Sequence, residues 1–243
     1  MDKKLKQIIQ ESTNMVFFGG AGVSTESNIP DFRSEQGLYN AEHKYGMCPE
    51  RIISHSFFVD DTETFYDYYK NNMIYREARP NKAHMALALL EKQKKLKAVV
   101  TQNIDGLHQM AGSKNVFELH GSVLRNNCMD CGEGYDLDYI MDPKNCKGSI
   151  PKCRECGGTV KPDVVLYEEG LSEEMINGAV RAIAEADTLI VGGTSLVVYP
   201  AAGLINYFRG KDLILINKQS TPHDRNATLV INKPIGEVLG ELL

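Results

Sequence analysis

Four cysteines in two closely spaced pairs form the pattern in this sequence that points most directly to a chemistry. Two residues separate Cys128 from Cys131, and the same spacing separates Cys153 from Cys156. Thiolates are preferred ligands of Zn²⁺, and four of them complete its tetrahedral shell and leave no position for water or substrate. The spacing therefore predicts one structural zinc ion. Cys146 lies between the pairs without a partner at that spacing, so a surface or packing role is expected for it.

A glycine-rich turn indicates a second chemistry, the binding of a nucleotide. The apolar run 15–18 leads into Gly-Gly-Ala-Gly-Val-Ser-Thr at 19–25, where small residues let backbone N–H groups approach a pyrophosphate. The third glycine of the dinucleotide pattern G-x-G-x-x-G is missing. No strand leads to a ribose-binding carboxylate either, since Pro30 and Gly37 interrupt the chain before Glu42. The turn thus favours nucleotide binding and disfavours a hydride-transferring dehydrogenase.

Polar residues follow two further apolar runs at the point where each run ends. Gln102, Asn103 and Asp105 follow one run, and His120 follows the next. Parallel strands present such residues together at the carboxyl edge of a sheet, where ligands bind. An imidazole has an ordinary pKa near 6.5 and can accept a proton at neutral pH. A lone histidine more often caps a strand, but the polar cluster opposite His120 favours it as the catalytic base.

These residues need a scaffold, and the hydrophobic pattern indicates an α/β fold with a doubly wound, parallel, Rossmann-like sheet. Short apolar runs of the kind that form strands buried on both faces alternate with amphipathic helical stretches. Two segments, 40–81 and 126–158, interrupt the alternation and predict a smaller zinc-binding domain, while 1–39, 82–125 and 159–243 form the nucleotide-binding domain. The expected strands are 15–18, 98–101, 116–119, 189–191, 213–216 and 229–231, and the expected helices are 3–11, 82–95, 172–186 and 200–208.

These motifs, in this order and over essentially the whole chain, resemble the sirtuin family in its bacterial form with a single catalytic core. The resemblance implies an NAD-dependent protein-lysine deacetylase that transfers the acetyl group to ADP-ribose and releases nicotinamide and O-acetyl-ADP-ribose. NAD is the implied co-substrate, and acetylated lysine side chains of proteins are the implied partners. The segments that carry the resemblance are the glycine turn, Asn-Ile-Pro-Asp-Phe-Arg at 28–33, Thr-Gln-Asn-Ile-Asp-Gly-Leu-His at 101–108, His120 with Gly121, Gly-Thr-Ser at 193–195, Asn217 and the cysteine pairs.

The resemblance also implies roles for individual residues. His120 is the implied base that helps to deprotonate the ribose diol after the acyl oxygen has attacked C1′ of the ribose. The substrate peptide is implied to lie as an added strand between segments 161–169 and 196–200. The implied contacts of phosphate and adenosine are Ala21, Gly22, Thr25, Gly193, Thr194, Ser195, Asn217 and Pro234; those of the nicotinamide ribose are Asp31, Phe32, Arg33, Gln102, Asn103, Ile104 and Asp105; those of the acyl-lysine are Val164, Leu166 and Val198.

The chain departs from the sirtuin pattern at a few positions. Asn28 and Glu168 stand where the family usually has glycine. Asparagine tolerates a positive φ better than most residues, so we expect the turn at Asn28 to persist, whereas Glu168 is expected to disturb the geometry of its loop. Sirtuins that prefer succinyl or malonyl groups resemble one another in a Tyr-x-x-Arg pair, and Tyr66 offers the tyrosine without the arginine. A preference for acetyl and other neutral acyl groups follows.

The overall composition limits the partners. The formal net charge is -5 and the sequence pI is about 5.7, which argues against a protein that neutralises nucleic-acid phosphates. The sequence has no long apolar run and no apolar signal core, so we expect a soluble, cytoplasmic protein without membrane association. Its oligomeric state stays open, and a monomer is compatible with the sequence. The alternatives are an NAD(H) oxidoreductase, a zinc-ribbon binding module and, within the family, a protein mono-ADP-ribosyltransferase.

Overall fold

The larger part of the molecule is built on a parallel sheet. The computed structural model describes residues 2–31 and 42–243, so Phe32 and Arg33 lie outside the described residues. The sheet has six strands in the order β11-β10-β9-β1-β2-β3, and all neighbouring strands in it pair in parallel. All six predicted strands and the doubly wound arrangement are confirmed. The strands are β1 (Met15–Gly19), β2 (Leu96–Thr101), β3 (Val116–Glu118), β9 (Thr188–Gly192), β10 (Asp212–Ile216) and β11 (Leu229–Ile231).

Helices cover both faces of this sheet, which explains why its central strand β1 has no polar side chain. In β1, Phe17 packs into the hydrophobic cluster on one face, while Val16 and Phe18 pack into the cluster on the other. A central parallel strand therefore has no polar face. Residues of α1 (Lys3–Glu11), α6 (Lys82–Lys92) and α10 (Ile235–Leu239) join the first cluster, and residues of α9 (Glu173–Glu185) and η4 (Ala201–Tyr207) join the second.

The helix predictions were right in position and wrong in two details. The helix predicted over 82–95 ends at Lys92, because Lys94 adopts a left-handed conformation with φ 63° that cannot continue an α-helix. The segment 200–208 forms a 3₁₀ helix at Ala201–Tyr207 instead of an α-helix. The amphipathic pattern locates a helical face, but it does not specify the hydrogen-bonding register of a short helix.

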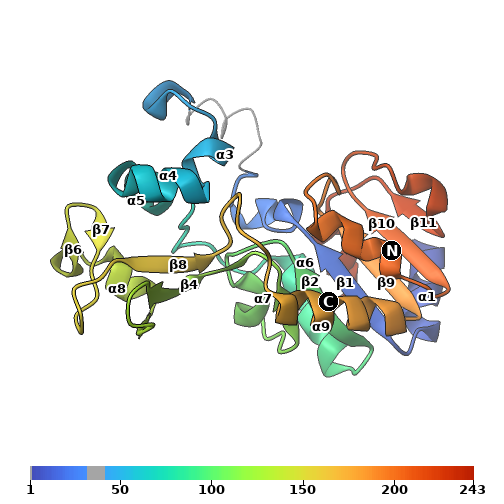
Figure 1. The fold of residues 1–243 in the computed structure, drawn as a ribbon. Helices are drawn as coiled ribbons and strands as arrows, with labels where there is room; N and C mark the ends of the chain where they lie inside the picture. The colour runs from blue at the N-terminus through green and yellow to red at the C-terminus, as the bar shows by residue number, and fades with distance from the viewer. Residues whose placement is uncertain (1, 32–41) are drawn as a thin grey trace.

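The rest of the molecule extends to one side of the large sheet (Figure 1). It contains a three-stranded antiparallel sheet in the order β5-β4-β8 and a separate hairpin of β6 and β7. A third hydrophobic cluster joins this sheet to helices α3 to α5, with Phe58 and Phe65 among its buried residues. The elements are β4 (Gly121–Cys128), β5 (Gly134–Tyr135), β6 (Cys146–Lys147), β7 (Ile150–Pro151), β8 (Val160–Val164), α3 (Pro49–Ile52), α4 (His55–Asp60), α5 (Thr62–Asn72) and α8 (Leu137–Met141). The short helix α7 (Leu107–Met110) belongs to the larger part, where it packs against α6.

We find no candidate for a membrane-spanning helix within residues 2–31 and 42–243. None of the helices in these ranges combines the length and the apolar composition that a membrane-spanning segment requires.

Two buried histidines lie in contact where α6 packs against α7. The rings of His84 and His108 are 4.7 Å apart between centroids, and neither side chain is exposed by more than 1%. Burial lowers the pKa of each imidazole below the ordinary value of 6.5, and the neighbouring His84 lowers the pKa of His108 further. Both side chains are therefore neutral in the folded protein at neutral pH.

This pair predicts an acid-sensitive fold. Below pH 6.5 the unfolded chain binds protons at both histidines while the folded protein does not, so stability is complete above that pH and is lost as the pH falls. Each histidine is expected to lower the unfolding free energy by up to about 1.4 kcal/mol per pH unit. Urea unfolding at pH 7.0, 6.3 and 5.6 measures the slope. His108→Leu is expected to reduce it; a flat profile in the wild type, or an unchanged slope in His108→Leu, would contradict the prediction.

Candidate active site and metal centre

The register of the large sheet brings four turns to one edge. Gly19 at the end of β1 pairs with Thr101 of β2 and with Gly192 of β9, and Gly192 pairs with Ile216 of β10. The turns that follow these strands therefore begin at the same level. The chain leaves β1 for β2 on one side, and β9 lies on the other, so the strand order reverses at β1. A crevice at such a reversal is the common ligand site of open α/β sheets.

The glycine turn after β1 packs directly on the turn after β9. The N–H of Gly22 donates to the carbonyl oxygen of Gly193 at 2.8 Å. A Cβ atom on Gly22 would lie 2.8 Å from the Cα atom of Gly193, so a larger residue would separate the two turns. Asn28, which ends the following 3₁₀ turn η2 (Thr25–Ser27), has φ 62°. The expectation that asparagine would keep the left-handed conformation at this position is confirmed.

A hydrogen-bond network fixes the polar loop after β2. The hydroxyl of Ser24 donates to Asp105 Oδ2 at 2.6 Å and accepts from Asn103 Nδ2 at 3.0 Å. The other carboxylate oxygen of Asp105 accepts from the N–H of Leu107 at 2.9 Å. Ser24 is absent from the predicted site residues. A serine in a glycine turn is common, and only the tertiary contact with Asp105 shows that this hydroxyl joins the two turns.

His120 is held in one tautomer by the backbone. Its Nδ1 lies 2.9 Å from the carbonyl oxygen of Gln102. A carbonyl oxygen can only accept, so Nδ1 carries the hydrogen and Nε2 keeps a lone pair. Burial lowers the pKa of His120 below 6.5, and the bond to Gln102 opposes this shift in part. The next residue, Gly121, has φ 73°, and a Cβ atom there would collide with the carbonyl oxygen of Asp163. The imidazole is thus a neutral proton acceptor at neutral pH.

A cavity of about 640 Å³ joins these elements to the small sheet and the helical segment. Most of the predicted site residues that the structure describes line it. Among the predicted NAD and acyl-lysine contacts, four do not line it: Gly22, Thr25, Asn217 and Pro234. The predicted residues on its wall are Ala21, Asp31, Gln102, Asn103, Ile104, Asp105, His120, Val164, Leu166, Gly193, Thr194, Ser195 and Val198.

Asn217 carries a polar group without a partner among the described residues. Its Oδ1 accepts from the N–H of Thr194 at 2.9 Å, which orients the amide, while its Nδ2 is buried and makes no hydrogen bond. A buried donor that lacks a protein partner commonly indicates a missing ligand or water. The Nδ2 of Asn217 therefore fits an acceptor atom of a bound nucleotide.

Tyr66, the tyrosine of the incomplete Tyr-x-x-Arg pattern, does not line the cavity. Its ring is fully buried and its hydroxyl donates to the carbonyl oxygen of Val160. Tyr68, on another face of α5, lines the cavity instead. The guanidinium of Arg76 also borders the cavity, but it forms an ion pair with Asp138.

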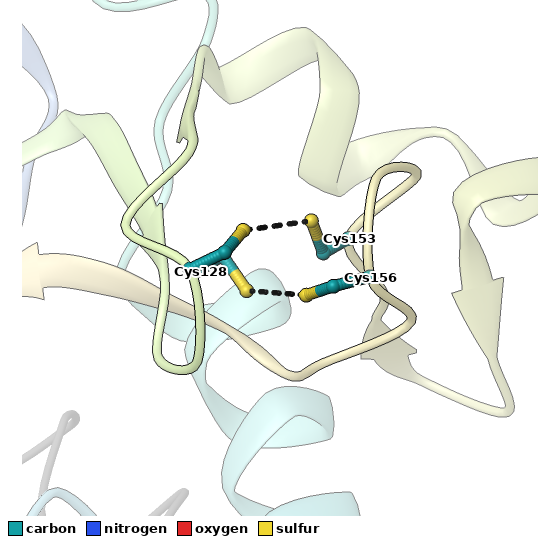
Figure 2. Close-up of side chains that lie close together, drawn as sticks. Cys128, Cys153 and Cys156 are labelled. Atoms are coloured by element: carbon teal, nitrogen blue, oxygen red, sulfur yellow. Dashed lines mark hydrogen bonds between the residues drawn. The ribbon is translucent and has the colours of Figure 1, made fainter.

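The four predicted zinc ligands lie together at the far end of the small sheet. The Sγ atoms of Cys128 and Cys156 are 3.4 Å apart, and those of Cys131 and Cys153 are 3.6 Å apart. All four sulfurs lie within 4.8 Å of one another, and Figure 2 shows three of these side chains converging from two loops. Zn–S bonds of about 2.3 Å in a tetrahedron place sulfurs about 3.8 Å apart. The donor set and its spacing therefore fit one Zn²⁺ ion.

Cys146 stands outside the four-cysteine cluster, as expected from its spacing. Its sulfur accepts a hydrogen bond from Lys70 Nζ at 3.3 Å. The hydroxyl of Tyr135, in contrast, lies 3.0 Å from the sulfur of Cys153 and is placed to orient that ligand.

Comparison with known proteins agrees with this arrangement. The sequence profile of the Sir2 family matches residues 20–200. The NAD-dependent protein deacetylase of Clostridium perfringens strain 13 is 64% identical over 241 residues, which cover 99% of this chain and 97% of that protein.

Two solved structures show the same fold. A Sir2 homologue in complex with NAD has a TM-score of 0.87 and 40% identity, covering 100% of this chain and 92% of that one. A Sir2 variant with a deacetylated p53 peptide and 3′-O-acetyl-ADP-ribose has a TM-score of 0.87 and 37% identity, covering 98% of this chain and 95% of that one. Sequence and structure thus lead to one assignment: the chain belongs to the Sir2 family.

Proposed function

We propose that this protein is an NAD-dependent protein-lysine deacetylase. The observation that carries the proposal is His120, a neutral imidazole whose Nδ1 is committed to the Gln102 carbonyl and which lines the cavity at the carboxyl edge of the sheet. The relative from Clostridium perfringens bears the same activity in its name, and one structural neighbour holds a deacetylated peptide with an acetylated ADP-ribose. The products are deacetylated lysine, nicotinamide and O-acetyl-ADP-ribose.

The residues around the cavity divide the work between binding and proton transfer. NAD supplies a ribose carbon that can receive the acyl oxygen once nicotinamide leaves. The lone pair on Nε2 of His120 accepts the proton of a ribose hydroxyl, which is the task of a general base. Asp105, locked by Ser24, keeps the loop after β2 in place beside that ribose. The backbone of the glycine turn at Ala21 faces the phosphates, because small residues allow a close approach.

The acyl-lysine is proposed to enter between the two parts of the molecule. Segments 1–39, 82–125 and 159–243 form the NAD-binding domain in this proposal, and 40–81 with 126–158 form the smaller domain. Val164, Leu166 and Val198 line the cavity and offer an apolar wall. A neutral acetyl-lysine suits such a wall because desolvating a charged group there is costly. Tyr66 is buried and Arg76 is paired with Asp138, which supports a preference for acetyl and other neutral acyl groups.

The partners and compartment follow from the same chemistry. The net charge of -5 favours basic protein segments as substrates and disfavours nucleic acid. None of the cysteines in the described residues is in a disulfide, and a four-thiolate zinc site requires reduced sulfur. Both points support our proposal of a cytoplasmic location.

Nicotinamide release tests this proposal directly. Purified protein with NAD and an acetyl-lysine peptide is expected to release one nicotinamide for each acetyl group lost, measured by chromatography and peptide mass in the same sample. The unmodified lysine peptide serves as the control and is expected to give release near background. Formation of NADH without peptide deacetylation would favour an oxidoreductase, and ADP-ribose attached to protein would favour the transferase.

A further inference from the structure

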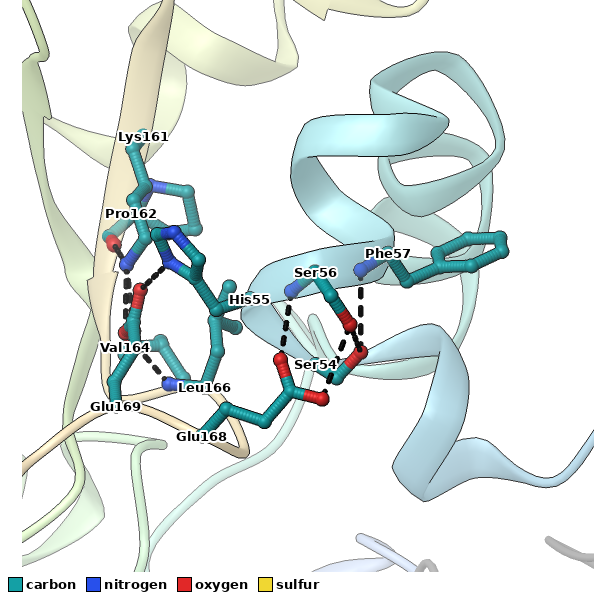
Figure 3. A network of polar contacts seen from close by, with 10 residues as sticks. All are labelled: Ser54, His55, Ser56, Phe57, Lys161, Pro162, Val164, Leu166, Glu168 and Glu169. Atoms are coloured by element: carbon teal, nitrogen blue, oxygen red, sulfur yellow. Dashed lines mark hydrogen bonds and ion pairs between the residues drawn. The ribbon is translucent and has the colours of Figure 1, made fainter.

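Glu168 adopts a backbone conformation that glycine favours, yet its side chain is fully engaged. Its φ is 76°, in the left-handed region that L residues rarely adopt. Its Oε2 accepts from the N–H of Ser56 at 2.9 Å and its Oε1 accepts from the hydroxyl of Ser56 at 3.0 Å. Figure 3 shows this carboxylate reaching from the loop after β8 to the first turn of α4. Glu168 thus keeps the left-handed backbone conformation that glycine favours, so the expected disturbance of the backbone is absent at this residue, and two hydrogen bonds hold its side chain.

The contact satisfies the start of α4. The hydroxyl of Ser54 accepts from the N–H of Phe57, so Ser54 caps one free donor of the first turn. Glu168 takes up a second free donor, the N–H of Ser56, and its negative charge complements the helix dipole. Phe58 of the same helix packs in the third hydrophobic cluster. The helix is therefore a fixed support, and the loop is the element that the contact positions.

Backbone pairing joins the same two segments beside the side-chain contact. The N–H of Tyr167 donates to the carbonyl oxygen of Ile53 at 3.0 Å, and the N–H of His55 donates to the carbonyl oxygen of Tyr167 at 2.9 Å. Among the described residues, no backbone hydrogen bond engages the N–H or the carbonyl oxygen of Glu168. One edge of the loop is thus bound to residues 53–55, and the backbone of Glu168 keeps its hydrogen-bonding capacity for another strand.

The next residue, Glu169, also fastens the loop. Its Oε1 lies 2.9 Å from Nδ1 of His55, and its Oε2 accepts from Lys161 Nζ at 3.1 Å and from the N–H of Leu166 at 2.9 Å. Both Glu168 and Glu169 border the cavity. Consecutive carboxylates therefore fasten this wall of the cavity: Glu168 binds Ser56 of α4, while Glu169 binds His55 of the same helix, Lys161 of β8 and the backbone of its own loop.

We propose that Glu168 is a positioning residue for the substrate peptide. Its side chain holds the loop 165–169 against α4, so that the backbone of Glu168 is already in place to pair with an incoming acetylated peptide. This inference rests on the deacetylase function proposed above. Preorganising a loop lowers the conformational cost of binding, so the effect belongs to peptide binding and not to the chemical step.

Three substitutions distinguish the effect of the side-chain contact from the effects of the negative charge and of the positive φ. Glu168→Gly removes the side chain and also relieves the positive φ. Glu168→Gln keeps an acceptor for the Ser56 N–H and a donor for its hydroxyl but removes the negative charge. Lys94→Gly is the matched control, because Lys94 is an exposed residue with φ 63°, so the substitution relieves the same kind of backbone conformation in the turn between α6 and β2.

The expected result is a change in one kinetic constant. Because both contacts of Glu168 are exposed to solvent, Glu168→Gly should raise the KM for an acetyl-lysine peptide by about fivefold. The kcat and the KM for NAD should stay within twofold. Glu168→Gln and Lys94→Gly should match the wild type within twofold. An unchanged peptide KM in Glu168→Gly would overturn the proposal, and so would an equal rise in Glu168→Gln, which would assign the effect to charge.

Hydrogen exchange of the peptide-free protein tests the contact without catalysis. Amides in 165–169 are expected to exchange faster in Glu168→Gly than in the wild type, and at the wild-type rate in Lys94→Gly. Equal protection in Glu168→Gly would overturn the proposal even if the protein is an active deacetylase. A separate outcome is that exchange is faster in Glu168→Gly but the wild-type protein releases no nicotinamide. In that case the loop contact would stand, while both the proposed function and the peptide role of Glu168 would fail.

Discussion

Replacing His120 with alanine is expected to lower the kcat for deacetylation by about a thousandfold, because a positioned general base contributes roughly 10² to 10⁴ in rate. The Nδ1–H of His120 donates to the Gln102 carbonyl, so the imidazole has a fixed orientation and Nε2 remains as the base. The variant should keep its fold and its zinc, since His120 belongs to neither hydrophobic cluster beside the large sheet nor to the metal site. Nicotinamide release under saturating NAD and peptide measures the loss.

His120→Asn is the matched control for position. An asparagine amide can still donate to the Gln102 carbonyl but has no basic nitrogen, so it should be as inactive as alanine. The wild-type enzyme should also keep its activity below pH 6.5, because burial lowers the pKa of His120 and protonation then requires a lower pH. The acid limb of the kcat profile locates this pKa. Full activity in either variant would remove His120 from the mechanism.

Loss of one zinc ligand is expected to be the most destabilising change in the chain. Cys128→Ser leaves a three-cysteine site, and structural zinc sites contribute on the order of 10 kcal/mol to folding in small domains. Because whole proteins are stable by only about 5 to 15 kcal/mol, we expect unfolding of the small sheet and a large fall in Tm. Zinc content by atomic absorption should drop from one ion per chain to near zero.

Cys146→Ser provides the control for this experiment. Cys146 lies outside the four-cysteine cluster and contacts Lys70, so its removal should leave one zinc ion bound and change Tm by a few degrees at most. Stoichiometric zinc in the Cys128→Ser protein would instead point to Cys146 as a replacement ligand and would revise the metal site.

The sequence predicts the large sheet well because its strands are buried on both faces. Every residue of β1 is buried, so the hydrophobic run and the strand coincide. The positions of Gln102 and His120 follow from the same run pattern, because Gln102 directly follows β2, His120 comes two residues after β3, and the register brings the ends of these strands together. The zinc ligands are predicted equally well, since the spacing within each cysteine pair is local in the sequence.

Tertiary contacts account for what the sequence did not show. Ser24 and Asp105 are 81 residues apart, and Ser56 and Glu168 are 112 apart, so no local pattern connects either pair. The departure from glycine at Glu168 marks an unusual position but does not reveal its partner. Helix α6 ends early because Lys94 adopts a left-handed conformation, and a lysine in the sequence does not predict that conformation. Tyr66 is buried because α5 packs its aromatic side chains inward.

Strand β4 joins the base to the metal. It begins at Gly121, next to His120, and it ends at Cys128, so eight residues separate the two centres along an extended strand. At about 3.4 Å per residue this is roughly 25 Å, well beyond the screening length of about 8 Å at physiological ionic strength. The charge of the zinc ion therefore has almost no influence on the proton affinity of the imidazole. The metal therefore acts on the reaction only through rigidity, because it fixes one end of strand β4.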